Sequence, residues 1–340
     1  MRRRWLLWGS LLSVVVLLLG AGGWVVYQNE YDLKEERVTI TGGKQPLHGV
    51  LARPTGGRTP AGLVVFVHGD GPTNATHDTF YRPIWEAIAK AGYASLSWDK
   101  PGVDGAPGNW LDQSIQDRAD ETVAAIAWAK KQPGIDPARI GLWGASQAGW
   151  VMPKAARQSP DVKFVIAVAP AVNWLQQGRY NLLAELRKKH ATPAETAAAI
   201  ARSDRNLAAL RAGQTFEQYR AGGGDVDGLT PQRWDFNRRN HTSDASDDLA
   251  ALRVPVLLFL GGRDINVDSD DTEAGYRRIL TTPGQLRVKR YPDATHNIVP
   301  ESVEDSELES TFLAIAAPRS LFSPGYLDEH RSFLTSLGQR

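Results

Sequence analysis

The amino-acid sequence predicts an α/β fold with a mostly parallel sheet and helices on both of its faces. Apolar runs of strand length recur near residues 63, 93, 140, 164 and 256, and helical stretches at 83–91 and 112–131 lie between the first of them. Alternation of this kind is typical of parallel strands joined by helices. With 340 residues, 42% of them hydrophobic, the chain is long enough for one large domain with an insertion.

The N-terminal residues 1–28 form a separate segment. Three arginines precede an uncharged stretch from Trp5 to Tyr27. Because about 20 apolar helical residues cross a bilayer, we expect a transmembrane anchor, with the folded domain outside the cytoplasm of a single-pass cell-membrane protein. A cleaved signal peptide is the alternative, since Gly20–Gly23 offers small residues, and it would leave a secreted or periplasmic protein.

The folded part of the chain is expected to begin with an antiparallel pair of strands, 36–41 and 47–53. A buried strand, Leu63–Val67, follows and leads into a glycine-rich loop, His68–Pro72. Glycines let the backbone of such a loop approach a ligand closely. We expect the backbone N–H of Asp70 to be a hydrogen-bond donor there and His68 to order the loop.

The segment Gly144–Gly149 contains the most informative motif. A short buried strand, Arg139–Trp143, is predicted before it and a helix after it. A serine on a sharp strand-to-helix turn exposes its hydroxyl beside helix N–H groups, which makes Ser146 the candidate nucleophile. The N–H groups of Gln147 and Asp70 are then the candidate oxyanion hole. Taken alone, the motif could also be an ordinary Gly-Ser loop.

Residues 171–250 interrupt the alternation of strands and helices. The spacing of leucine and alanine predicts short amphipathic helices, and their position between two strands predicts a helical cap over the serine. The core would then comprise residues 29–170 and 251–340. Four aromatic residues in the insertion either line an acyl pocket or pack internally: Trp174, Tyr180, Trp234 and Phe236.

The candidate acid and base follow the last two strands. Val254–Leu260 is an apolar run that suits a strand buried on both faces, and Asp264 lies just beyond it, where open α/β sheets place their sites. His296 follows an alternating edge strand, Leu286–Tyr291. In this order His296 would take the proton of Ser146, and Asp264 would fix the imidazole tautomer.

Composition and spacing give no indication of a metal or cofactor. Asp264, Asn266 and Asp268 have the spacing of the first calcium ligands of an EF-hand, but Ser269 and Gly275 stand where the glycine and glutamate are required. The absence of cysteine excludes disulfides and thiolate chemistry. With 39 basic and 38 acidic side chains, the net charge of +1 does not favour a nucleic-acid partner.

A family resemblance rests on His68–Pro72 (HGDGP), Trp98–Val103 (WDKPGV) and Ile135–Gly141 (IDPARIG), together with Asp264 and His296. By these motifs the chain resembles the α/β-hydrolase superfamily. It is most similar to its dienelactone-hydrolase-like and serine-aminopeptidase-like esterases. The resemblance extends over most of the chain beyond the N-terminal segment.

Together the residues and the resemblance imply a serine hydrolase that cleaves a small-molecule carboxylic ester or thioester through an acyl-enzyme, without a cofactor. A peptidase or amidase of the same superfamily is one alternative, because the same triad cleaves amides. Acyl transfer to an alcohol is another. A catalytically silent binding module is the non-enzymatic alternative, although the intact set of triad candidates argues against it. The oligomeric state is not predicted.

Overall fold

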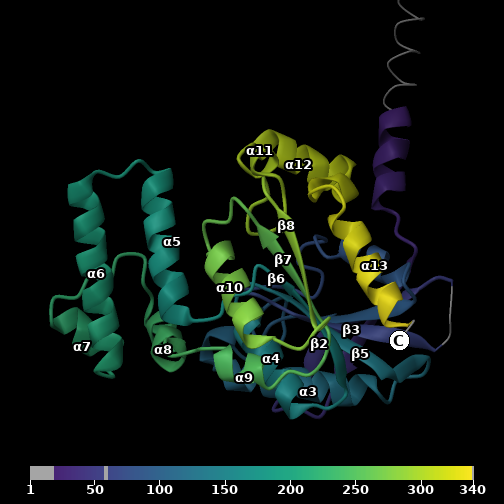
Figure 1. Ribbon diagram of the computed structural model, residues 1–340, viewed down its shortest axis with the longest axis horizontal. Coiled ribbons are helices and arrows are strands. Elements are labelled where there is room, and N and C mark those ends of the chain that lie inside the picture. Colours follow the sequence, from purple (N-terminus) through teal and green to yellow (C-terminus); the bar gives the residue numbers. More distant parts are fainter. Residues whose placement is uncertain (1–18, 57–59, 339–340) are drawn as a thin grey trace, which may run out of the picture.

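The computed structural model describes residues 19–56 and 60–338. Within them, an eight-stranded sheet has the order β1-β2-β4-β3-β5-β6-β7-β8 (Figure 1). The pairs β1–β2 and β2–β4 are antiparallel, and every other neighbouring pair is parallel. This confirms the predicted mostly parallel sheet with an antiparallel start. The strands are β1 (Leu33–Ile40), β2 (Leu47–Pro54), β3 (Ala61–Val67), β4 (Tyr93–Trp98), β5 (Ile135–Ala145), β6 (Val162–Val168), β7 (Val256–Gly261) and β8 (Leu286–Tyr291).

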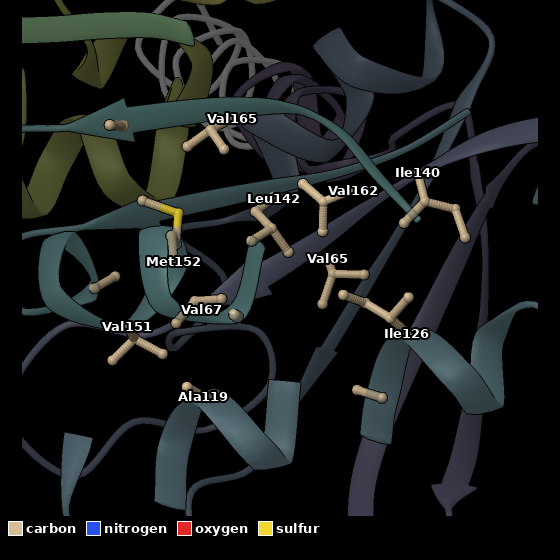
Figure 2. Packing of buried hydrophobic residues seen from close by; sticks show 14 of the residues in the cluster. Val65, Val67, Ala119, Ile126, Ile140, Leu142, Val151, Met152, Val162 and Val165 are labelled. Atoms are coloured by element: carbon tan, nitrogen blue, oxygen red, sulfur yellow. The ribbon is translucent and has the colours of Figure 1, made fainter. Parts of the chain in front are cut away.

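Helices cover both faces of the sheet, and each face has its own layer of core. One layer packs the sheet against α3, α4, α9 and α10, and Val65, Leu142 and Met152 lie within it (Figure 2). The other packs the sheet against α2 and α13. Burial from both sides explains why the central strands are apolar at nearly every position. The helices of these layers are α2 (Arg82–Ala89), α3 (Ile115–Ala129), α4 (Ala148–Gln158), α9 (Ser246–Ala250), α10 (Ser269–Ile279) and α13 (Tyr326–Leu337).

Four helices between β6 and β7 gather at one side of the sheet: α5 (Trp174–Lys188), α6 (Pro193–Arg211), α7 (Phe216–Ala221) and α8 (Pro231–Asn240) (Figure 1). Threonine side chains begin three of them: Thr192, Thr215 and Thr230 each accept a hydrogen bond from an N–H of the first turn. A small apolar cluster of their own includes Phe216 and Trp234. These four helices are called the cap below.

The structure corrects the prediction of a transmembrane helix. In the part of the chain that it describes, no helix is both long and apolar enough to cross a membrane. The side chains of Trp24 and Asn29 also donate hydrogen bonds, of 2.9 and 2.7 Å, to carbonyls of α12 (Glu307–Ala316).

Residues 1–18 of the predicted anchor lie outside the described residues. On the finding above, the predicted anchor, its membrane partner and the single-pass membrane location are wrong.

The remaining elements are the helix α11 (Glu301–Glu304) and the short 3₁₀ helices Trp110–Asp112 and Pro318–Leu321.

Candidate active site

Ser146 occupies the sharp turn between β5 and α4 with a backbone φ of 55°. A non-glycine residue in this left-handed region is uncommon and strained, which is typical of functional turns. The turn is crowded on both sides of the serine. A Cβ added to Gly144 would lie 2.8 Å from the carbonyl oxygen of Val67, and one added to Gly149 would lie 2.4 Å from that of Ala171. Only glycine fits these two positions.

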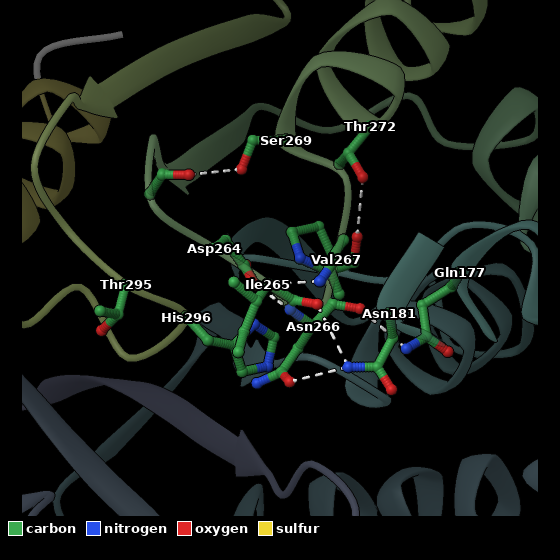
Figure 3. A network of polar contacts seen from close by, with 12 residues as sticks. Gln177, Asn181, Asp264, Ile265, Asn266, Val267, Ser269, Thr272, Thr295 and His296 are labelled. Atoms are coloured by element: carbon green, nitrogen blue, oxygen red, sulfur yellow. Dashed lines mark hydrogen bonds and ion pairs between the residues drawn. The ribbon is translucent and has the colours of Figure 1, made fainter. Parts of the chain in front are cut away.

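His296 and Asp264 form a hydrogen-bonded pair beside the carboxyl ends of β7 and β8. The distance from His296 Nδ1 to Asp264 Oδ2 is 2.8 Å, and the Asp264 side chain is buried. The other carboxylate oxygen accepts the N–H groups of Asn266 and Val267 at 2.7 and 2.9 Å (Figure 3). Both oxygens therefore have fixed partners, and the imidazole is oriented with its Nε2 directed away from the aspartate.

One cavity of about 630 Å³ brings the candidate residues together. Ser146, His296, Asp70 and Gln147 line it, and Asp264 stands behind the histidine. Among the described residues no hydrogen bond links Ser146 to His296; such contacts are often long before substrate binds. The arrangement places a hydroxyl and an imidazole beside a single cavity, together with the two residues whose backbone N–H groups are the candidate donors.

Lys100 orients the backbone of the loop that follows β3. Its buried Nζ donates to the carbonyls of Gly69 and Gly71 at 2.6 and 2.7 Å. A trans peptide directs its C=O and N–H to opposite sides, so the N–H of Asp70 faces away from Lys100. The loop also approaches the serine closely, because a Cβ on Gly69 would lie 3.4 Å from Ser146 Cβ. Burial lowers the pKa of Lys100 well below its ordinary value.

Arg118 of α3 links this loop to the residue after the serine. The buried guanidinium donates to the carbonyl of His68 and, at 2.5 Å, to the side-chain oxygen of Gln147. The amide nitrogen of Gln147 donates in turn to Asp70 Oδ1 at 3.1 Å. The side chains of both residues that carry a candidate oxyanion donor therefore belong to one hydrogen-bonded network. This network restricts the motion of each residue.

His68 lies beneath the loop rather than in the cavity. Its ring nitrogens contact the carbonyl of Trp98 at 2.6 Å and the hydroxyl of Tyr81 at 3.1 Å. Burial lowers the pKa of His68 well below its ordinary value, with a further effect from Lys100. These contacts are those of a histidine that orders the loop, the role expected of it from the sequence.

The cavity walls combine aromatic rings with side-chain amides. Of the four aromatic residues singled out in the cap, only Trp174 is among the lining residues. Trp234 stacks on Tyr219 with 4.4 Å between ring centroids, and Phe236 is fully buried, so both serve packing. Besides Gln147, the amides come from the cap and from the acid and base loops: Gln177, Asn181, Asn237, Asn266 and Asn297.

Three cations near the site have no counterpart in the sequence predictions: Lys100, Arg118 and Arg233. Arg233 comes from α8 and pairs with the carboxylate of Asp70. Nothing in the local sequence distinguishes these side chains from solvated ones, because the groups that they contact lie far away along the chain. Lys100 belongs to the motif Trp98–Val103 of the family resemblance, but that motif does not predict its contacts.

The strand order, the serine on its strand-to-helix turn and the Asp264–His296 pair define an α/β-hydrolase, as the resemblance implied. The chain belongs to the family described as Serine aminopeptidase, S33, which matches residues 58–303. It is therefore a hydrolase of this superfamily and an enzyme.

Relatives and solved structures agree with this assignment. Thiohydrolase apmlB of Arthrinium phaeospermum is 34% identical over 27% of this chain and 30% of its own length. An uncharacterized peptidase, YuxL of Bacillus subtilis, is 21% identical over 83% of this chain and 38% of its own length. The matched region thus spans about a third of these relatives. An esterase of Pyrococcus furiosus shares the fold, with a TM-score of 0.56 and 16% identity over 91% of each chain.

Proposed function

We propose that this hydrolase cleaves a carboxylic ester or thioester through an acyl-enzyme formed on Ser146. Ser146 Oγ attacks the carbonyl carbon while His296 Nε2 takes its proton, and Asp264 stabilises the imidazolium. The proton then passes to the leaving alcohol or thiol as its bond to carbon breaks. Water repeats the sequence and releases the acid. The observation that carries this proposal is the 2.8 Å Asp264–His296 pair on the cavity that Ser146 also lines.

The backbone N–H groups of Asp70 and Gln147 are proposed to stabilise the oxyanion. Two features support this role. The Gly69–Asp70 peptide is turned with its carbonyl toward Lys100, and Gln147 directly follows the serine at the start of α4. Donors fixed in advance need no reorganisation when the negative charge develops.

The proposal predicts that a fluorophosphonate probe labels the wild-type protein and that Ser146→Ala abolishes labelling. Only a serine activated by a neighbouring base reacts quickly with such probes. Ser310→Ala, a serine on the surface helix α12, is the matched control and should label like wild type. Equal labelling of Ser146→Ala and wild type would reject Ser146 as the nucleophile.

Amide hydrolysis is a second candidate function. The family description and the name of the Bacillus subtilis relative refer to peptidases, whereas the Arthrinium relative is named a thiohydrolase. Initial rates on matched ester, thioester and amide substrates with one acyl group separate these functions. We expect the amide to be the slowest of the three, and an amide preference would favour the peptidase.

A further inference from the structure

The side chain of Asp70 poses an electrostatic problem for the site just proposed. Its N–H is the candidate oxyanion donor, while its carboxylate belongs to the same residue and lines the same cavity. A negative charge at this position opposes the negative charge that develops on the substrate oxygen. A cation paired with that carboxylate would offset this repulsion.

Arg233 of the cap is placed to neutralise it. Its Nη1 donates to Asp70 Oδ1 at 3.0 Å and its Nη2 contacts Oδ2, which makes a two-pronged ion pair. The guanidinium lies over the rings of Phe236 and Trp110, 5.1 and 5.6 Å from their centroids. Burial raises the pKa of Asp70, but the hydrogen bonds and charge of Arg233, together with the charge of Lys100 and the N–H of Gly71, leave that pKa below its ordinary value.

The other two cations of the site do not bond to this carboxylate. Lys100 donates to the carbonyls of Gly69 and Gly71, and Arg118 donates to the carbonyl of His68 and the side chain of Gln147. Within the described residues, the hydrogen bonds to the Asp70 carboxylate from other side chains come from Arg233 and from the neutral amide of Gln147.

We propose that Arg233 neutralises Asp70, so that the oxyanion hole is electrostatically complete only while α8 of the cap is seated on the core. The inference rests on the proposed function. Arg233 acts through Asp70 and is a positioning residue.

The test begins with Arg233→Gln, assayed on an ester that the wild type turns over and that Ser146→Ala does not. We expect kcat to fall on the order of tenfold to a hundredfold, because an unpaired charge then lies near the oxyanion. Arg233→Lys, which keeps the charge, should retain most of the activity. Arg238→Gln is the matched control on the same helix, since Arg238 pairs with Asp235 at the surface, and its kcat should equal that of wild type.

The decisive measurement is the double variant Arg233→Gln/Asp70→Asn. Removing the unpaired charge should raise kcat several-fold above that of Arg233→Gln alone. If Arg233 only fastened the cap, the second substitution would restore nothing, because the fastening is already broken. A double variant no faster than Arg233→Gln, or a single variant as fast as Arg238→Gln, overturns the inference while leaving the proposed function intact. A wild-type protein that turns over no ester, thioester or amide would overturn both the inference and the proposed function.

Discussion

Asp264 and Asp268 lie on one loop after β7, and their carboxylates accept different hydrogen bonds. Asp264 pairs with His296, whereas Asp268 accepts the N–H groups of Asp270 and Asp271 at 3.0 and 3.1 Å. Asp268 is therefore the residue that caps α10. Its position close to Asp264 in the sequence does not give it a catalytic role. The two aspartates can be separated by experiment.

Asp264→Asn should lower kcat by several orders of magnitude, on the order of 10⁴, because the imidazole loses the partner that fixes its tautomer. Asp268→Ala should instead lower the free energy of unfolding by about 1 kcal/mol, the usual effect of losing a helix cap, and leave kcat within a factor of about two. Ester kinetics and urea unfolding of both variants check this. A crippled Asp268→Ala beside an active Asp264→Asn would mean that the acid has been misassigned.

At the scale of elements, the loop after β3 is shaped by its neighbours. The ends of β4 and α3 contribute Lys100 and Arg118, whose side chains bind the carbonyls of the loop. Helix α5 holds the acid loop at the same cavity. Tyr180 donates to the carbonyl of Asp264 at 2.7 Å and Asn181 to that of Ile265 at 3.1 Å (Figure 3 shows Asn181).

Lys100→Met should therefore lower kcat with little change in KM. The loop carbonyls would lose their donor, and the Gly69–Asp70 peptide would be free to turn, which removes one oxyanion donor for part of the time. Complete loss of such a donor costs about 10²- to 10³-fold, so we expect a loss of roughly tenfold to a hundredfold. Lys163→Met, an exposed lysine that bonds to Pro160, is the control. If kcat stays near wild type while thermal unfolding shows a folded protein, Lys100 does not orient the donor.

The sequence predicted those helices and strands whose pattern of polarity lies within one short stretch of residues. The last strand, Leu286–Tyr291, matches its predicted bounds, because alternation of polarity is a local property. The contacts of Lys100, Arg118 and Arg233 were not predicted. Their partners Gly69, His68 and Asp70 are 31, 50 and 163 positions away, so no local pattern distinguishes these cations from solvated ones.

The transmembrane prediction failed for a similar reason. The prediction rested on the apolar residues up to Tyr27. In the structure, the end of this apolar stretch is hydrogen-bonded to the folded domain. Trp24 and Asn29 bond to α12, which lies almost three hundred residues further along the chain. Hydropathy records the composition of a segment and not its neighbours.

At the scale of the whole molecule, the site depends on helices that hold both faces of the sheet. Helix α13 docks through His330, which is fully buried. The indole Nε1 of Trp143 donates to His330 Nε2 at 3.0 Å, and His330 Nδ1 lies 2.9 Å from the carbonyl of Tyr326. One ring nitrogen therefore accepts and the other donates, which requires the neutral imidazole. Burial lowers the pKa of His330 to about 4.

This histidine predicts a loss of stability in acid. The unfolded chain binds a proton near the reference pKa of about 6.5, whereas the folded protein resists it until about pH 4. Well above pH 6.5 neither state is protonated and His330 contributes no pH dependence. Between these values the unfolded state holds more protons, so the free energy of unfolding falls as the pH falls, by up to about 1.4 kcal/mol per pH unit from this residue.

Urea unfolding of wild type and His330→Gln between pH 7 and 4.5 measures that contribution. Other groups titrate in the same range, so the quantity of interest is the difference between the two slopes. Between pH 6 and pH 4.5 this difference in slope should approach about 1.4 kcal/mol per pH unit, the value for one proton. The expectation does not depend on how much stability the variant loses at pH 7. His48→Gln, at an exposed position of β2, controls for the loss of a histidine as such. Equal slopes for His330→Gln and wild type would show that α13 does not depend on a neutral His330, and that acid destabilises the molecule at other sites.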